Sequence, residues 1–326
     1  MKNKIAKKSR YFGRLEMLNK IVKGIYQVVL PLPYSLQSVN SYLLEGENGY
    51  TVIDTGDTIE SINVWEQLRK PGIVIEKVIL THTHPDHCGL ACWFQEELQV
   101  PVIVSNYSII ELERIKQRYL DGSPLNDLFL KHGGPKLPKA VLSSPSPFDF
   151  LPDSIYQHGE TIKFGNDSFE AIWTPGHAKD QFCFYNPELQ IMMVSDHVLA
   201  DISPMIELRG EEGENPLQDY FTSLDLIKTY PVKVALTGHG GLIDDLQARI
   251  DEIQARHQHR LNQMLDILSN DALSAAQISE MIYKKQNQRF QIEQFMAIIT
   301  RLLYLESIGK VNSKQQNGKV YYQAIG

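Results

Sequence analysis

The segment Thr81-His82-Thr83-His84-Pro85-Asp86-His87-Cys88-Gly89 determines how this chain is interpreted. It follows an apolar run, residues 74–80 (VIEKVIL), that is typical of a β-strand. If the backbone stays extended, His82 and His84 point to the same side, and Asp86 and His87 can serve a second ion. A solvated turn or a helix cap would explain an isolated His-x-His, but the carboxylate and imidazole that follow favour a metal site.

Three further imidazole and carboxylate groups stand directly after strand-like runs later in the chain: His177, Asp196 and His239. Taken singly, they would be explained as a core histidine, a helix-capping aspartate and a loop histidine. Side chains at the ends of neighbouring strands, however, can converge on one edge of a sheet sandwich. We therefore predict that these three residues join the first cluster in one metal centre.

The complete pattern HxHxDH…H…D…H resembles the signature of the metallo-β-lactamase superfamily, over about residues 23–245. The resemblance implies an α/β fold, an αββα sandwich, and two divalent metal ions, zinc first and iron or manganese as alternatives. The ligands that it implies are His82, His84 and His177 for one ion, Asp86, His87 and His239 for the other, and Asp196 as the bridge.

Residues around the ligands refine the resemblance. Asp54 matches a family aspartate that orients a ligand histidine, although a strand-ending turn explains it equally well. Ser195 stands where relatives often have glycine before the bridging aspartate. Asp196 in place of cysteine does not fit the best-known lactam-hydrolysing subclass, and His84 in place of a carboxylate does not fit the diiron flavoproteins. The pattern does fit glyoxalase II-like thioesterases, lactonases and a ribonuclease branch.

The chemistry expected of such a centre is hydrolysis. Two cations that share a water molecule lower its pKa from about 15.7 towards neutrality and yield hydroxide. We expect attack on a small ester, thioester or lactone, with Asp86 as the catalytic residue that orients the nucleophile and shuttles its proton. Tyr220 is a candidate substrate contact, although packing of a helix at 216–229 explains it too. The alternatives are a metal-dependent phosphodiesterase or endoribonuclease, and a binding protein that keeps its metals but turns over slowly.

Three regions are expected along the chain: an N-terminal extension (1–22), the catalytic domain (23–245), and a helical linker with a small winged-helix-like domain (246–326). Strand-like and helical runs alternate in the catalytic domain, which predicts helices outside β-sheets. The winged-helix layout rests on two helical segments and a hairpin: 273–284, 289–305, 308–312 and 318–324.

Residues 121–152 are rich in proline, glycine and serine. Such a composition predicts a long loop, and long loops in compact domains are usually functional or mobile. We interpret it as a lid or an insertion on the substrate side.

The charge is uneven along the chain. The total of −7 argues against a protein whose whole surface binds nucleic acid or acidic lipid. Residues 255–326 carry nine Lys or Arg and five Asp or Glu, which gives +4 there and leaves −11 for the rest. The basic side chains that could contact phosphates are Lys284, Lys285, Arg289, Lys310, Lys314 and Lys319. A solvated face explains this charge as well, so a small-molecule substrate is favoured over a nucleic-acid partner.

The remaining features concern packing and location. The apolar positions Leu261, Met264, Leu265 and Leu268 predict a helix face that packs on the catalytic domain or on a second subunit of a homodimer. Three cysteines do not make a disulfide framework and indicate a reducing compartment. No apolar segment of signal-peptide length follows the basic N-terminus, and no apolar run approaches the roughly 20 residues of a membrane span. We therefore expect a cytoplasmic protein without membrane contact.

Overall fold

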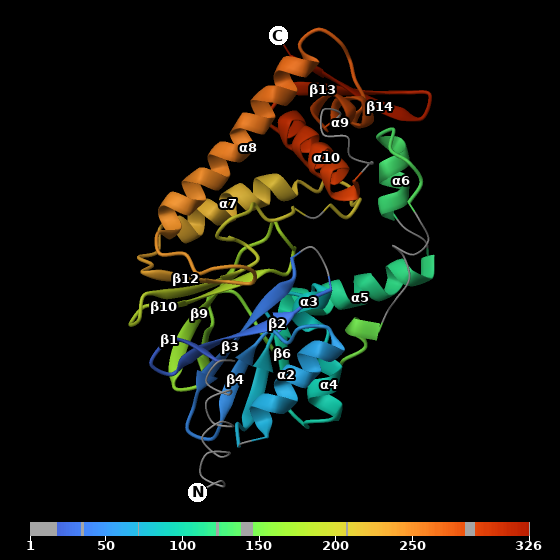
Figure 1. The fold of residues 1–326 in the computed structure, drawn as a ribbon. Coiled ribbons are helices and arrows are strands. Elements are labelled where there is room, and N and C mark those ends of the chain that lie inside the picture. The colour runs from blue at the N-terminus through green and yellow to red at the C-terminus, as the bar shows by residue number, and fades with distance from the viewer. Residues whose placement is uncertain are drawn as a thin grey trace, which may run out of the picture.

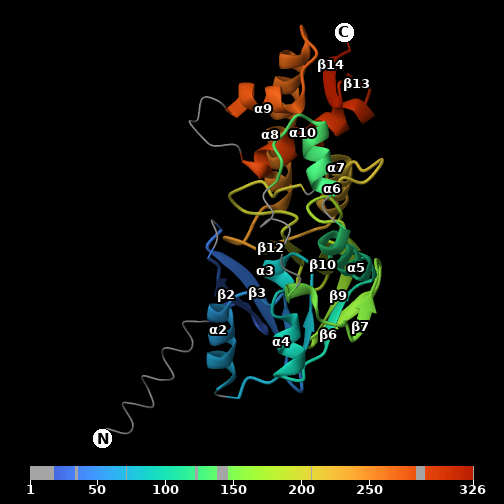
Figure 2. The same cartoon turned by 90° about the vertical axis from the view of Figure 1, so that its right-hand side faces the viewer.

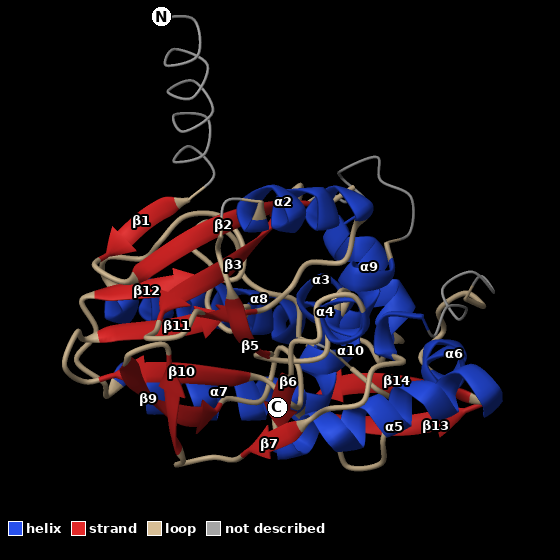
Figure 3. Ribbon diagram, turned by 90° about the horizontal axis from the view of Figure 1, so that it is seen from below, coloured by secondary structure: helices blue, strands red, loops and turns tan. Residues whose placement is uncertain are grey.

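The computed structural model describes residues 18–33, 36–70, 72–121, 124–137, 146–206, 208–283 and 291–325. Two β-sheets face each other and carry helices on their outer sides (Figure 1). The order of layers, helix–sheet–sheet–helix, is the αββα sandwich expected from the sequence. Figure 3 shows the strands of both sheets in red, with the helix α2 (Ile59–Arg69) on the outside.

The first sheet contains seven strands that lie side by side in chain order. They are β1 (Asn19–Val22), β2 (Ile25–Pro31), β3 (Ser38–Glu45), β4 (Tyr50–Ile53), β5 (Ile75–Ile79), β6 (Val102–Ser105) and β7 (Ser154–Tyr156). Strands β1 to β4 pair antiparallel, whereas β4 to β7 pair parallel. The parallel arrangement brings the carboxyl ends of β4 and β5 to the same edge, and the segments that contain Asp54 and His82 begin there.

The second sheet contains five strands in the order β12-β11-β10-β9-β8. They are β8 (Thr161–Phe164), β9 (Asp167–Trp173), β10 (Phe182–Asn186), β11 (Ile191–Ser195) and β12 (Val234–Thr237). Strands β11 and β12 are parallel neighbours, and the other pairs are antiparallel. Asp196 follows β11 and His239 follows β12, so these two residues start from the same edge of this sheet.

Apolar side chains fill the spaces between the layers. One cluster fills the space between the sheets and includes Phe169, Phe184 and Ile53. A second cluster lies between the first sheet and its helices, where Trp65 and Phe94 pack edge to face with ring centroids 5.3 Å apart. The helices of this side are α2 (Ile59–Arg69), α3 (Pro85–Cys88), α4 (Ala91–Glu96) and α5 (Asn106–Asp121), and a short 3-10 helix, η2, covers Ser146–Phe148.

The outer side of the second sheet is covered by α7 (Pro216–Lys228) and α8 (Leu246–Leu268). Beyond α8 the chain forms α9 (Ala275–Tyr283), α10 (Ile292–Ser307) and an antiparallel hairpin of β13 (Val311–Gln316) and β14 (Lys319–Ala324). Figure 2 shows these C-terminal elements together at the end of the molecule opposite α2 and α4.

The C-terminal elements share one apolar core with the outer side of the second sheet. Leu261 and Met264 of α8 are buried in the same cluster as Leu217 and Leu224 of α7. The helix face predicted from the apolar spacing therefore packs within this chain. An uninterrupted core ties α10 and the hairpin to the sandwich.

The region 121–152 differs from the long loop that its composition predicts. It contains the helix α6 (Pro124–Lys131), whose Phe129 packs against Phe295 of α10 with ring centroids 4.9 Å apart. Leu125, Leu128 and Phe129 repeat at helical spacing and cover the C-terminal core, which explains why a segment with many loop-forming residues is helical. Residues 138–145 lie outside the described residues.

Smaller differences concern element boundaries. Helix α10 continues to Ser307, so the first strand of the hairpin begins at Val311 and not at residue 308. Strands β1, β7 and β8 have no counterpart in the sequence prediction, because each is short and only partly apolar. Within the described residues, no helix combines the length and apolar character that a bilayer crossing requires.

Candidate metal centre

The seven predicted ligands come together at the edge where the strands of both sheets end. His82 and His84 lie in the segment after β5, and Asp86 and His87 lie in α3. The other three come from the second sheet, in the β9–β10 connection and after β11 and β12: His177, Asp196 and His239.

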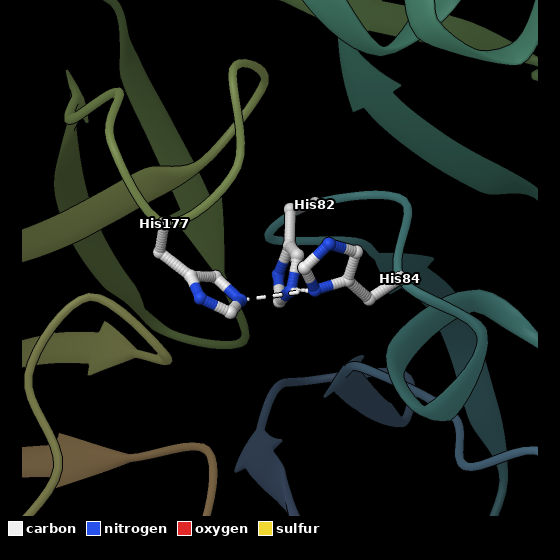
Figure 4. A group of neighbouring side chains, drawn as sticks. All are labelled: His82, His84 and His177. Atoms are coloured by element: carbon white, nitrogen blue, oxygen red, sulfur yellow. Dashed lines mark hydrogen bonds between the residues drawn. The ribbon is translucent and has the colours of Figure 1, made fainter. Parts of the chain in front are cut away.

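Three imidazoles form the first group of donors. His84 Nδ1 lies 3.0 Å from His82 Nε2 and 2.9 Å from His177 Nε2. Figure 4 shows the three rings turned towards one another, His82 and His84 from one segment and His177 from another. Their nitrogens lie within 4.8 Å of one another, a spacing at which three ligands can hold one metal ion.

Asp86, His87 and His239 form a second group with the same spacing. Asp86 Oδ2 lies 3.2 Å from His239 Nε2 and 4.0 Å from His87 Nε2. The side chain of Asp86 is 17% exposed, whereas those of His87 and His239 are buried, so the carboxylate of Asp86 faces the accessible side of this group.

Asp196 lies between the two groups. Its Oδ2 is 3.6 Å from His177 Nε2 in the first group and 3.3 Å from His239 Nε2 in the second. Its Oδ1 is 3.3 Å from His87 Nε2. A single carboxylate therefore reaches both groups.

The outward nitrogens of three ligand rings face fixed acceptors. His87 Nδ1 lies 2.7 Å from Asp54 Oδ2, His177 Nδ1 lies 2.7 Å from the Met205 carbonyl oxygen, and His239 Nδ1 lies 2.6 Å from that of Ser38. A carbonyl or carboxylate oxygen can only accept, so each of these Nδ1 atoms carries the proton. In the neutral form of each ring the Nε2 lone pair therefore points inward, which is the tautomer that a metal ligand needs.

Asp54 contacts both ends of the His-rich segment. Its Oδ1 accepts a hydrogen bond from the Thr81 backbone N–H (2.8 Å), and its Oδ2 accepts one from the Thr81 hydroxyl (2.8 Å). The same Oδ2 faces His87, so the carboxylate holds the His-rich segment at both its start and its end.

The charges in the centre complement each other. Burial raises the pKa of Asp86, but His87, His239 and His84 outweigh this effect and lower it to about 2. Burial lowers the pKa of His239, but the neighbouring carboxylates of Asp196 and Asp86 raise it to about 9. Burial and the neighbouring His84 lower the pKa of His177 to about 4. Asp86 is thus ionised and His177 neutral, as metal coordination requires, whereas His239 must release a proton before its Nε2 can bind a metal.

Unpaired atoms show that the donors fit a cation. His87 Nε2, His239 Nε2 and Asp196 Oδ1 are buried without a hydrogen-bond partner among the described residues. Leaving buried polar atoms unpaired is costly, and these three all face the space between the two groups. A divalent cation there would satisfy them together.

Two glycines are required by this geometry and were not found from the sequence. A Cβ at Gly238 would lie 2.0 Å from Asp196 Oδ1, and a Cβ at Gly176 would lie 2.5 Å from the Cα of Tyr220. Gly238 therefore lets β12 approach the bridging carboxylate, and Gly176 lets the His177 segment approach α7. The -Gly-His- pairs themselves are the signal that could have indicated both positions.

Tyr220, the candidate substrate contact, is buried in the core. Its side chain is 0% exposed, and its hydroxyl donates to the His197 carbonyl oxygen (2.9 Å). The interpretation as helix packing holds, because α7 presses this ring into the core behind Gly176. The His197 ring is also buried, 5.0 Å from the Tyr220 ring, and belongs to neither donor group.

Comparison with known proteins agrees with this geometry. The sequence profile of the metallo-β-lactamase superfamily matches residues 35–255, more than half of the chain. This chain belongs to the metallo-β-lactamase superfamily. The superfamily is metal-dependent and its members related to this chain are hydrolases, so the donor groups described above are its candidate metal-binding groups.

Several individual proteins are similar over most of their length. A probable metallo-hydrolase, YqjP, of Bacillus subtilis (strain 168) is 25% identical and aligns with 93% of this chain and 98% of its own. An atrochrysone carboxyl ACP thioesterase of Aspergillus fumigatus is 26% identical over 77% of this chain and 69% of its own. The metallo-β-lactamase family protein TTHA1429 of Thermus thermophilus is 27% identical, with a TM-score of 0.78 over 94% of this chain and 100% of its own.

Ser195, directly before Asp196, has an unusual backbone conformation. Its φ of 45° lies in the left-handed region that favours glycine. The serine hydroxyl lies 2.9 Å from the Thr81 hydroxyl and 3.5 Å from Asp54 Oδ2. In this member of the superfamily, hydrogen bonds to the supporting residues therefore offset the backbone strain.

Proposed function

We propose that this chain is a hydrolase with two divalent cations, zinc in the native protein, that cleaves a small ester, thioester or lactone. The observation that carries the proposal is the position of Asp196, whose two carboxylate oxygens reach both groups of histidine donors. Five imidazoles and two carboxylates form a mixed nitrogen and oxygen set that suits zinc.

The cations, when bound, would lower the pKa of water and polarise the carbonyl that is attacked. The chain's own groups do the rest. Asp86 is ionised, with a pKa of about 2, and accessible, so an Oδ atom accepts a hydrogen bond from the attacking water and orients it. The same carboxylate passes the proton on to the leaving group. Asp54 keeps the His87 ring in place throughout.

The name of one relative favours a thioester as the substrate. The Aspergillus fumigatus relative is named a thioesterase, and its similarity spans 77% of this chain. Hydrolysis of a thioester requires an oriented water molecule and a thiolate leaving group, and both requirements suit two cations with a carboxylate at their accessible side.

A nucleic-acid phosphodiesterase or endoribonuclease is the second candidate. It is favoured by the order of the C-terminal elements, which we propose to be a winged-helix module. Leu273 forms an isolated antiparallel bridge with Tyr322 of β14, beside the hairpin. Lys310, Lys314 and Lys319 are exposed on or beside the hairpin, whereas Lys284, Lys285 and Arg289 lie outside the described residues.

The test is a panel of thioesters, lactones, phosphodiesters and RNA, offered to the metal-loaded full-length protein. We expect thioester or lactone hydrolysis, and a loss of about a hundredfold or more in kcat for Asp86→Asn, because the acceptor for the water is weakened. Asp266→Asn removes an exposed carboxylate of α8 and is the control. Salt-dependent RNA cleavage without thioester turnover would replace the proposal by the second candidate. Full metal occupancy with no turnover on any substrate would make the chain a binding protein.

A further inference from the structure

A cavity of about 290 Å³ lies between the segment Ser203–Ile206 and the helices α8, α9 and α10. It contains none of the seven candidate ligands. Its polar lining includes His257 and Arg260 from α8, Tyr283 from α9, and Arg301 from α10. The apolar walls come from Pro204, Ile206 and Leu217.

Two side chains of this cavity, His257 and Arg301, have buried nitrogens without hydrogen-bond partners among the described residues. His257 is 4% exposed, and neither of its ring nitrogens has a hydrogen-bond partner among the described residues. Arg301 Nε is buried and unpaired, although its Nη1 donates to the Ala297 carbonyl oxygen (2.9 Å). Buried N–H groups without acceptors are costly, and here they gather around one space.

The two guanidinium groups also lack counter-charges. Within the described part of the chain, neither Arg260 nor Arg301 forms an ion pair with a carboxylate. Arg260 donates to the Gln263 side chain (2.5 Å) and lies over the Tyr283 ring. Burial, with a contribution from Arg260, lowers the pKa of Arg301 to about 10. Glu293 belongs to the lining, but it is exposed.

The cavity shares a wall with the metal centre. Met205 lines the cavity, and its carbonyl oxygen is the acceptor for Nδ1 of the ligand His177 (2.7 Å). A molecule in the cavity would therefore lie against the segment that orients His177. Met205 thus connects the cavity to the candidate ligand His177.

We propose that this cavity binds an anionic group, a carboxylate or a phosphate, on the substrate of the metal centre, so that the substrate is an acidic thioester or ester. The inference rests on the proposed function for the identity of the ligand as substrate. The anion-binding site itself stands on the unpaired donors alone. Guanidinium groups bind both kinds of anion through paired N–H donors, and the ring of His257 adds one more donor.

The binding test uses the metal-loaded full-length protein and three probes of similar size: phenyl phosphate, phenylacetate and the neutral benzyl alcohol. Arg260→Gln removes a partly exposed guanidinium, and Arg256→Gln removes one that is exposed on the same helix α8 and serves as the control. We expect Arg260→Gln to weaken binding of an anionic probe by about tenfold, and Arg256→Gln to change it by less than about twofold. Arg301→Lys keeps a charge but not the paired donors and is expected to show a similar loss.

The two anions distinguish the chemistry of the substrate. Tighter binding of phenyl phosphate indicates a phosphate, and tighter binding of phenylacetate indicates a carboxylate. Equal binding of benzyl alcohol, or equal losses in Arg260→Gln and Arg256→Gln, would overturn the proposal, because anion contacts with the metals are common to all variants.

A kinetic test separates this proposal from the proposed function. Acyl thioesters of 3-mercaptopropionate and of N-acetylcysteamine differ in charge on the thiol side. Arg260→Gln should raise KM about tenfold for the anionic thioester, with kcat and the neutral thioester nearly unchanged. Anion binding that depends on Arg260, without turnover of any ester, would refute the proposed function and leave the cavity site standing. Turnover with no dependence on Arg260 would support the proposed function and refute the anion site in the cavity.

Discussion

The metal centre and the cavity between α8 and α10 both bury ionisable side chains, but they differ in which polar atoms have hydrogen-bond partners. In the metal centre, the outward nitrogens of His87, His177 and His239 each face an acceptor, and only the inward atoms are unpaired. In the cavity, His257 and Arg301 have unpaired nitrogens, and Arg301 forms no ion pair with a carboxylate of the described residues. Inward lone pairs with two carboxylates suit cations, and unpaired donors suit an anion.

The two regions also differ in how they are built. The metal centre stands on strand ends, where neighbouring backbones are held by sheet hydrogen bonds and the ligands need little adjustment. The cavity forms where the C-terminal helices pack over the segment Ser203–Ile206. Changes in the metal centre should therefore affect metal content and kcat, and changes in the cavity should affect affinity and the pH dependence of stability.

The largest effect is expected from Gly238→Ala. The new Cβ would lie 2.0 Å from Asp196 Oδ1 and 2.9 Å from His87 Cε1, so the bridging carboxylate must move. Displacement of a catalytic group by about 1 Å costs roughly a hundredfold in rate, and we expect at least this loss in kcat together with lower metal content. Gly241→Ala in the same turn meets no atom within 4 Å and should retain both. Full activity in Gly238→Ala would show that the two metal groups do not depend on Asp196.

Asp54→Asn should weaken metal binding by about tenfold to a hundredfold, because the His87 Nδ1 proton loses its charged acceptor at 2.7 Å. The measurement is competition for zinc with a chelator of known affinity. Glu60→Gln removes an exposed carboxylate from the start of α2 and provides the control. Unchanged affinity in Asp54→Asn would mean that the outward hydrogen bonds do not prepare the centre.

The unpaired His257 should make the fold sensitive to acid. Burial, with a contribution from Arg301, lowers the pKa of His257 from 6.5 to about 3, so the unfolded chain binds more protons between these values. Its contribution to stability is present above pH 6.5 and is lost as the pH falls towards 3. Between pH 7 and pH 5 this loss amounts to about 2 kcal/mol of unfolding free energy.

His257→Leu should remove that part of the pH dependence, measured as urea unfolding at several pH values. His259→Leu, at an exposed position of the same helix, should keep the wild-type dependence. An identical slope in wild type and His257→Leu would indicate that the imidazole has a partner in solution, and would weaken the contrast with the metal centre.

Ser195→Gly should have the smallest effect. Glycine relieves the left-handed backbone at φ 45°, by about 1 kcal/mol, but removes the hydrogen bond to Thr81, which contributes about the same. We expect the unfolding free energy to change by less than about 1 kcal/mol and metal content to stay constant. A loss of metal would mean that the serine hydroxyl itself holds the supporting residues in place.

Much of the metal centre could be predicted from the sequence, because its ligands directly follow strand-like runs. The run 74–80 predicts β5, and the ends of β11 and β12 place Asp196 and His239. The Gly-His pair marks Gly238, but the reason that this position must be glycine could not be predicted, since it arises from contact with Asp196, which is distant in sequence. The same holds for Tyr220, whose burial depends on how α7 packs against Gly176.

The C-terminal part was less predictable. The composition of 121–152 indicated a loop, yet Phe129 and its neighbours form α6 because the C-terminal core offers them an apolar surface. Arg260 and Arg301 follow no motif. Their proximity results from the packing of α8 and α10, which no local pattern encodes.

Metal content per chain tests the central claim most directly. Full-length protein is loaded with zinc, freed of excess metal and analysed by mass spectrometry of the elements, beside Asp196→Ala prepared in the same way. We predict two equivalents in the wild type and at most one in Asp196→Ala, because its carboxylate reaches both donor groups. A wild type with less than one equivalent, or an Asp196→Ala variant that retains two, would contradict the account.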